Sequence, residues 1–195
     1  MDAVAEQFIL TKGVANCINL SLEHIQQSPL AEMLKRTTCP DGTTIHLPIR
    51  VASRLEAIWH MTATYELDEE ARVDCHCAFM NVERLYKSMV YFCQRGTEIE
   101  ISIFSEWQVA VSMGFIKLIQ ARHTLALVIL AYYAASLTAI RTAWYTQNWA
   151  EFVLYEISQM LEDEMKQWIQ WPMEQIQQRM SELLVQSPAH ISTTT

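Results

Sequence analysis

The most uniform stretch of apolar positions in this chain is Arg122–Ile140. Almost every side chain within it is apolar, so a helix formed here has no face suited to solvent. Such a helix lies in the middle of a helical bundle or in a membrane. The uninterrupted apolar run Leu125–Ala135 is shorter than the roughly 20 residues that a membrane helix needs, and Ser136 and Thr138 follow it. The pattern therefore predicts a buried central helix and no membrane span.

On both sides of this segment, apolar residues recur every three or four positions, which predicts helices with one buried face. The expected helices are Asp2–Gln27, a short one from Ser28-Pro29 to Lys35, Ile49–Tyr65, Leu67–Cys93, Glu106–Ala121, Thr146–Glu162 and Pro172–Val185. The fold class is thus all-α, a single-domain bundle of about seven to nine helices around the central one. We expect the domain to cover residues 1–186, with a disordered polar tail at residues 187–195.

Turn chemistry and caps predict the connections. Thr37–Thr44 contains Pro-Asp-Gly and is expected to be a loop. Gly96 is expected to follow the end of its helix in the left-handed conformation. Ile99–Ile103 alternates between apolar and polar residues, and we expect an extended segment that leads to an N-cap at Ser105.

The same spacing predicts which side chains face the core. Gly13, in the first helix, is expected to mark a close crossing with another helix, because it lacks a side chain. The inward side chains predicted for the first three long helices are Phe8, Ile9, Val14, Cys17, Ile18 and Ile25, then Leu55, Ile58 and Trp59, then Val73, Cys77, Met80, Leu85, Met89 and Phe92.

Charge and cysteine content narrow the function classes. The formal net charge is -8 and there is no basic stripe, which argues against direct binding of nucleic acid by this chain. Five irregularly spaced cysteines argue against a disulfide framework, and Met1–Leu10 lacks the basic start of a signal peptide. We therefore expect a reducing compartment inside the cell.

Metal and cofactor chemistry is not expected. Cys75-His76-Cys77 contains two thiols at positions i and i+2, which point about 200° apart on a helix and cannot hold one ion. The four glycines are isolated, so no phosphate-binding loop is present in the sequence. The sequence predicts no metal site and no cofactor.

Aromatic residues are the most informative candidates for function. Flat, bulky side chains with methionines nearby suit a pocket for a flat apolar ligand, although the same residues also suit a plain core. The candidate ligand-binding residues are Trp59, Trp107, Phe115, His123, Tyr132, Tyr133, Trp144, Trp149 and Trp171. The candidate polar groups in such a pocket are His60, His123, Arg141 and Tyr132.

Several of these residues form a pattern with a family resemblance. The residues that carry the resemblance are His123, Ala126–Tyr133, Trp144, Trp149 and Trp168-Ile-Gln-Trp-Pro172. The pattern resembles the carboxy-terminal regulatory region of fungal binuclear zinc-cluster transcription factors, above all the sterol uptake control type. Thr124 stands where the family has proline. The family's basic six-cysteine DNA-binding module is not present in this sequence.

The resemblance implies a helical receptor for an apolar small molecule, of sterol, polyketide or terpenoid type. It implies regulation of transcription or of metabolite production, in the nucleus or cytoplasm, by a homodimer or with a coregulator. Regulation would come from a shift in conformational populations, because a bound ligand would favour one packing of the helices.

Two other functions remain open from the sequence. A free-standing copy of such a domain is also compatible with a cofactor-independent cyclase or isomerase, which needs a shaped cavity and one or two acid–base groups. Its candidate catalytic residues are His60, Asp74, His76, His123 and Arg141. The third possibility is a dimerisation module without a ligand.

Overall fold

The computed structural model describes residues 1–28, 45–140 and 144–178, apart from the side chains of Trp144, Tyr145 and Gln147. These ranges contain helices and no strand, so the all-α fold expected from the sequence is confirmed. The elements are α1 (Asp2–Leu20), α2 (Leu22–Gln26), α3 (Ile49–Thr64), α4 (Glu69–Gln94), α5 (Ile101–Ala110), α6 (Met113–Gln120), α7 (Thr124–Ser136), the 3-10 turn η2 (Leu137–Ala139), α8 (Trp144–Met160), α9 (Asp163–Lys166) and α10 (Gln170–Gln178).

Four expectations concern segments outside the described residues. They are the short helix after Ser28, the Thr37–Thr44 loop, the end of the last helix beyond Gln178 and the tail at residues 187–195.

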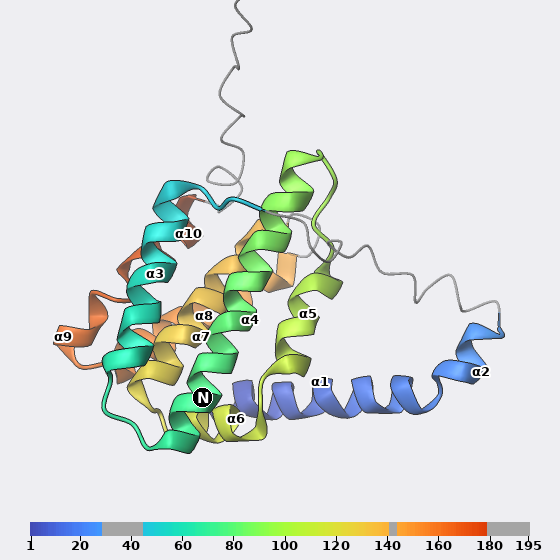
Figure 1. Ribbon diagram of the computed structural model, residues 1–195, viewed down its shortest axis with the longest axis horizontal. Coiled ribbons are helices and arrows are strands. Elements are labelled where there is room, and N and C mark those ends of the chain that lie inside the picture. Colours follow the sequence, from blue (N-terminus) through green and yellow to red (C-terminus); the bar gives the residue numbers. More distant parts are fainter. Residues whose placement is uncertain (29–44, 141–143, 179–195) are drawn as a thin grey trace, which may run out of the picture.

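Helix α7 is the buried centre of the bundle, as its composition predicts. Every residue from Leu125 to Ser136 is buried, and α7 packs against α3, α4, α6, α8 and α10 (Figure 1). The hydroxyls at its C-terminal end are satisfied locally, since Ser136 Oγ donates to Tyr133 O at 2.5 Å and Thr138 Oγ1 of η2 donates to Ala135 O at 2.8 Å. A helix without a polar face is thus stable here because its neighbours replace the solvent on every side.

Within the described ranges, no single helix is long and apolar enough to cross a membrane. The bent pair of α6 with Thr124–Ala139, whose two parts meet at 104°, passes the same test of length and composition only when taken together.

The expected helix Glu106–Ala121 is wrong, because the chain breaks at Val111 and Ser112. Ser112 is the N-cap of α6, and its hydroxyl accepts a hydrogen bond from Phe115 N at 2.9 Å. The N-cap expected at Ser105 is also wrong, since α5 already begins at Ile101 and Ser105 lies within it. The early start buries Ile103 and Phe104 in the core. The free energy gained by this burial outweighs the preference of the alternating pattern for an extended segment.

The two caps of α4 agree with the sequence pattern. The Asp68 carboxylate accepts from Ala71 N at 2.8 Å at the start of the helix. Gly96 follows its end with φ of 64°, a conformation that glycine adopts without strain.

Several predicted core positions are wrong. Of the core positions predicted in α1, Phe8 is buried, while Ile9, Val14 and Cys17 are exposed and Ile18 is half-buried, as is Ile25 of α2. In α4, Leu85, Met89 and Phe92 are buried as predicted, but Val73, Cys77 and Met80 are exposed. In α3, Leu55 and Ile58 are buried, but 38% of Trp59 is exposed. These helices carry apolar residues on more than one face, so the spacing of apolar residues alone does not identify the buried side.

The close helix crossing predicted at Gly13 is wrong as well. A Cβ added to Gly13 would meet nothing within 4 Å, whereas one added to Gly114 would lie 1.8 Å from Asp74 Oδ2. The crossing that requires glycine is therefore between α6 and α4.

Candidate functional site

Trp107 stands at the centre of a continuous aromatic core. Its ring stacks on Tyr133, with centroids 4.0 Å apart and planes 16° apart, and meets Phe8 and Phe115 edge-on at 5.6 and 5.9 Å. Its indole nitrogen donates to Ala78 O at 3.0 Å, which satisfies the one polar group it buries. Trp107 and Phe115, two of the predicted ligand-binding residues, thus lie in contact with other rings of the core.

A second aromatic group connects α7 to α4 and α10. Tyr132 stacks on Trp171 with centroids 5.3 Å apart, and Tyr86 donates from its hydroxyl to Tyr132 O at 3.0 Å. Burial raises the pKa of both Tyr86 and Tyr132, so both phenols stay neutral at physiological pH. Tyr132 and Trp171, two of the candidate ligand-binding residues, thus contact each other, and Trp171 is buried together with its neighbour Pro172.

The predicted residues Tyr133 and Trp149 share a cavity of about 320 Å³, which we call the Trp149 cavity. It lies where α1, α5, α8 and the end of α7 with η2 meet. Its lining consists of Gln7, Ile101, Phe104, Ser105, Gln108, Tyr133, Leu137, Thr146 and Trp149. Aromatic rings therefore form its walls, and side-chain amides and hydroxyls supply its polar groups.

Hydrogen bonds fix the polar side of this cavity. Trp149 Nε1 donates to Gln7 Oε1 at 2.8 Å, which joins residues 142 positions apart in the sequence. Gln108 Oε1 accepts from Thr11 Oγ1 at 3.2 Å, and the Tyr133 hydroxyl donates to Phe104 O at 3.3 Å. Trp149 thus fixes the side chain of Gln7, and Thr11 of α1 fixes the side chain of Gln108. Polar groups held in place in this way can orient a ligand.

Among the residues that the structure describes, no charged side chain lines the Trp149 cavity. Burial raises the pKa of Tyr133, although its hydrogen bond with Gln108 acts in the opposite direction. The phenol is therefore neutral at physiological pH, and the site suits an uncharged molecule.

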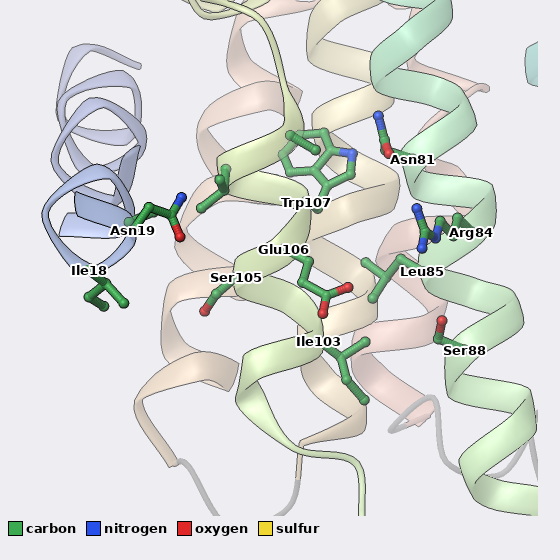
Figure 2. Close-up of a pocket in the computed structure, with 13 residues that line it drawn as sticks. Ile18, Asn19, Asn81, Arg84, Leu85, Ser88, Ile103, Ser105, Glu106 and Trp107 are labelled. Carbon is green, nitrogen blue, oxygen red and sulfur yellow. The ribbon is translucent and has the colours of Figure 1, made fainter. Parts of the chain in front are cut away.

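Two of the further hollows on the outside of the bundle have aromatic side chains in their lining. One, of about 390 Å³, lies between α3 and α4, with Trp59, Phe79 and Met80 in its wall. The other, of about 290 Å³, is the cleft between α1, α4 and α5 that Figure 2 shows, where Arg84 and Glu106 lie at the same opening. The first of these hollows has no side-chain amide in its described lining, and the second has one aromatic ring there, Trp107. The Trp149 cavity combines three aromatic side chains with two amides.

The predicted catalytic residues do not converge on one point. On α4, Asp74 accepts from Ser112 Oγ at 2.5 Å, whereas His76 lies against Trp59 with ring centroids 4.6 Å apart. These two residues therefore point toward α6 and toward α3, on different sides of their helix. His123 caps α7 and meets Tyr65 edge-on at 5.7 Å.

The other two members of the catalytic set are His60 and Arg141. His60 is exposed on α3. Arg141 lies outside the described residues, as does the side chain of the predicted ligand-binding residue Trp144.

The two thiols of Cys75-His76-Cys77 lie on opposite sides of α4, as the helical spacing predicts. Cys75 is buried and Cys77 is exposed. Burial, with the nearby Asp74 carboxylate, raises the pKa of the Cys75 thiol to about 12. Within the described part of the chain, no group of three or more His, Cys, Asp or Glu side chains is placed to hold a metal ion.

The sequence did not identify Gln7, Phe104 or Gln108 as members of the cavity. Gln7 and Gln108 lie about 100 residues apart, and no local motif marks either of them. Comparisons with protein-family models, with curated proteins and with solved structures give no match for this chain. The case for a function therefore depends on the geometry of the cavity and on the sequence pattern.

Proposed function

We propose that this chain is a helical domain that binds a compact, flat, apolar small molecule in the Trp149 cavity. The observation that supports this most is the combination found there: walls from Phe104, Tyr133 and Trp149, the fixed amides of Gln7 and Gln108, and a lining without charged side chains among the described residues. Ligand sites in proteins commonly combine an apolar concave surface with a few placed polar groups.

The size of the cavity limits the ligand. A volume of about 320 Å³ is at the lower end of the roughly 300–1,000 Å³ typical of small-molecule sites. A molecule of a few fused rings with one hydrogen-bonding oxygen therefore suits the cavity better than a large flexible lipid. Terpenoid and polyketide ring systems belong to this class, and a full sterol would extend beyond the cavity.

The resemblance of Ala126–Tyr133 and Trp168–Pro172 to fungal zinc-cluster regulators supports a sensor function in the regulation of transcription or of metabolite production. The cavity offers a mechanism, because its wall includes both α1 and α8. A ligand that contacts Gln7 and Trp149 together would stabilise the arrangement in which these helices are joined. Binding would then increase the population of molecules in which α1 is joined to α8, and a partner would respond to this change in the position of α1.

Nile red, a neutral dye with a flat fused-ring system, is a suitable first probe. We expect saturable binding to the full chain, followed by the change in dye fluorescence. Trp149→Ala removes one wall, and Ile101→Trp places a large ring at a lining position that is 41% exposed. Each variant should weaken binding about tenfold or more, which is about 1.4 kcal/mol.

Trp59→Ala is the matched control, since it removes an indole from the other apolar hollow. It should leave the affinity unchanged. Binding that is absent, or that all three variants change equally, would rule out this site. Competition by a panel of terpenoids, polyketides and sterols would then identify the ligand class.

The cyclase or isomerase hypothesis gains less from the structure. Asp74, His76 and His123 contact Ser112, Trp59 and Tyr65 respectively, and none of them lines the Trp149 cavity. The ligand-binding proposal is therefore the one that we carry forward.

A further inference from the structure

The second half of α1 has its apolar and polar faces reversed with respect to the bundle. Only Val4, Ala5 and Phe8 of this helix are buried. After Phe8 the helix continues beyond the bundle and leads to α2 at its far end (Figure 1). An explanation is needed for what the exposed half of this helix contacts.

The inner side of this half is polar. Thr11 Oγ1 donates to Gln108 Oε1 at 3.2 Å, and the Lys12 ammonium donates to Val109 O. Asn19 lines the cleft that separates α1 from α4 and α5 (Figure 2). The hydrogen bonds of Thr11 and Lys12 thus attach the segment to the body, and Ala15 and Ile18 line the cleft beside Asn19.

The outer side is apolar. At 100° per residue, six positions fall within about 140° of one another on the side opposite Phe8. We call them the arm face, and they are Ile9, Leu10, Gly13, Val14, Cys17 and Leu20. Leu10 is 69% exposed, Val14 52% and Leu20 88%. Isolated apolar residues on a surface need no explanation, but a continuous helical stripe of them indicates a contact with another molecule.

We propose that the arm face is an interface between two copies of this chain, paired as antiparallel α1 helices about an axis between Gly13 and Val14. In this register Leu10 of one copy faces Cys17 of the other, and Val14 faces Gly13. Leu10 and Val14 therefore each meet a smaller residue at the centre of the contact. The same surface serves both copies, as a two-fold contact requires. A Cβ placed on Gly13 would meet nothing within 4 Å, so that position has room for the Val14 side chain of a second copy.

Charge supports a second copy as the occupant. The chain carries a net charge of -8, so two copies repel each other over most of their surface. Between Ile9 and Leu22 the only charged residue is Lys12, which is turned inward onto Val109 O. The arm face is therefore a neutral surface, and two acidic copies can meet there without placing like charges opposite each other.

A membrane surface fits less well. Helices that lie on membranes carry Lys and Arg on their polar face, and here that face carries Thr11, Asn16 and Asn19 with the single inward Lys12. The acidic residues Glu6 and Glu23 flank the segment and would be repelled by an anionic lipid surface.

The mass of the full chain in solution, measured by analytical ultracentrifugation over a concentration series, tests the proposal. The wild-type chain should form a reversible dimer, and Val14→Asp should shift the dissociation constant at least tenfold towards the monomer. Val73→Asp is a matched control, because Val73 is 51% exposed in α4 and lies outside the arm face. It should dimerise like the wild type.

Cross-linking with diamide tests the register. Residues 10 and 17 of one helix are about 10.5 Å apart along its axis, too far for a disulfide within one chain. Leu10→Cys should give a covalent dimer through Cys17 of the other copy, and the same substitution combined with Cys17→Ala should not. The wild type should not cross-link through Cys17, since the two Cys17 residues lie apart in this register.

Three outcomes would overturn the proposal. The first is a wild-type chain that stays monomeric up to millimolar concentration, and the second is a dimer that Val14→Asp leaves intact. The third is a monomer that binds phosphatidylcholine vesicles through the arm face. Efficient cross-linking of the wild type through Cys17 would instead show a parallel pair and would exclude the antiparallel register.

Discussion

The indole ring of Trp107 lies flat against the phenol ring of Tyr133, with their centroids 4.0 Å apart. Trp107 is 2% exposed and Tyr133 is fully buried, so the pair fills the space between α5 and α7. Tyr133 has Trp107 on one side and lines the Trp149 cavity as well. The stack is thus both a core contact and the back support of one cavity wall.

Replacing Trp107 with alanine should destabilise the fold by about 3–5 kcal/mol, because it leaves a cavity among buried rings and removes the hydrogen bond from the indole to Ala78 O. Unfolding in urea, followed by circular dichroism, measures the loss. Trp59→Ala should cost much less, since Trp59 is already 38% exposed. Equal losses in the two variants would contradict the assignment of Trp107 to the core.

Gly114→Ala should cost about 1–3 kcal/mol, because the new Cβ would lie 1.8 Å from the Asp74 carboxylate. Asp74 cannot move away without losing its 2.5 Å hydrogen bond from Ser112 Oγ. Most of the cost should disappear when the same substitution is made in an Asp74→Ala background. A double-mutant cycle from urea unfolding would give this coupling, and simple additivity would show that the contact is unimportant.

The cysteines should differ strongly in reactivity toward iodoacetamide. Cys17 and Cys77 are exposed, whereas Cys75 is fully buried and burial raises its pKa to about 12. The thiolate is the reactive form, so Cys75 should be alkylated only after unfolding. Mass spectrometry of peptides after timed alkylation at about pH 8 measures this. Rapid labelling of Cys75 in the folded chain would contradict the packing of α4.

His123 should make the fold less stable in mild acid. Burial lowers the pKa of His123 below its usual value, while the nearby Asp68 carboxylate acts in the opposite direction. The unfolded chain therefore binds a proton at about pH 6.5, before the folded chain does, and stability falls as the pH decreases from about 6.5 to the lower folded pKa. Below that folded pKa the loss is complete.

His123→Gln should flatten this dependence, measured as urea unfolding at intervals from about pH 7.5 to pH 5. His60→Gln, at an exposed position of α3, is the control and should keep the wild-type profile. Identical profiles for all three proteins would show that the partial burial of His123 has no effect on stability.

The amino-acid sequence by itself determined the elements that depend on local chemistry. The apolar run Leu125–Ala135 required a buried helix, because it offers water no polar face. The Asp68 cap and the positive φ of Gly96 follow from the hydrogen-bonding and steric properties of single residues. Tyr133 and Trp149 are two of the nine candidate ligand-binding residues, and one cavity contains both, while their role in ligand binding stays a prediction.

Only the tertiary structure decided which side of each helix is buried. Ile9, Val14 and Cys17 have the correct spacing for a core stripe, but Phe8 and the bonds of Thr11 and Lys12 turn the opposite side of α1 to the bundle. The break at Ser112 and the crossing at Gly114 depend on Asp74, about 40 residues earlier. Gln7 and Gln108 likewise lie at the Trp149 cavity only because the folded chain brings α1, α5 and α8 together. Burial is a property of the whole assembly of helices, whereas a local pattern specifies only the period of each helix.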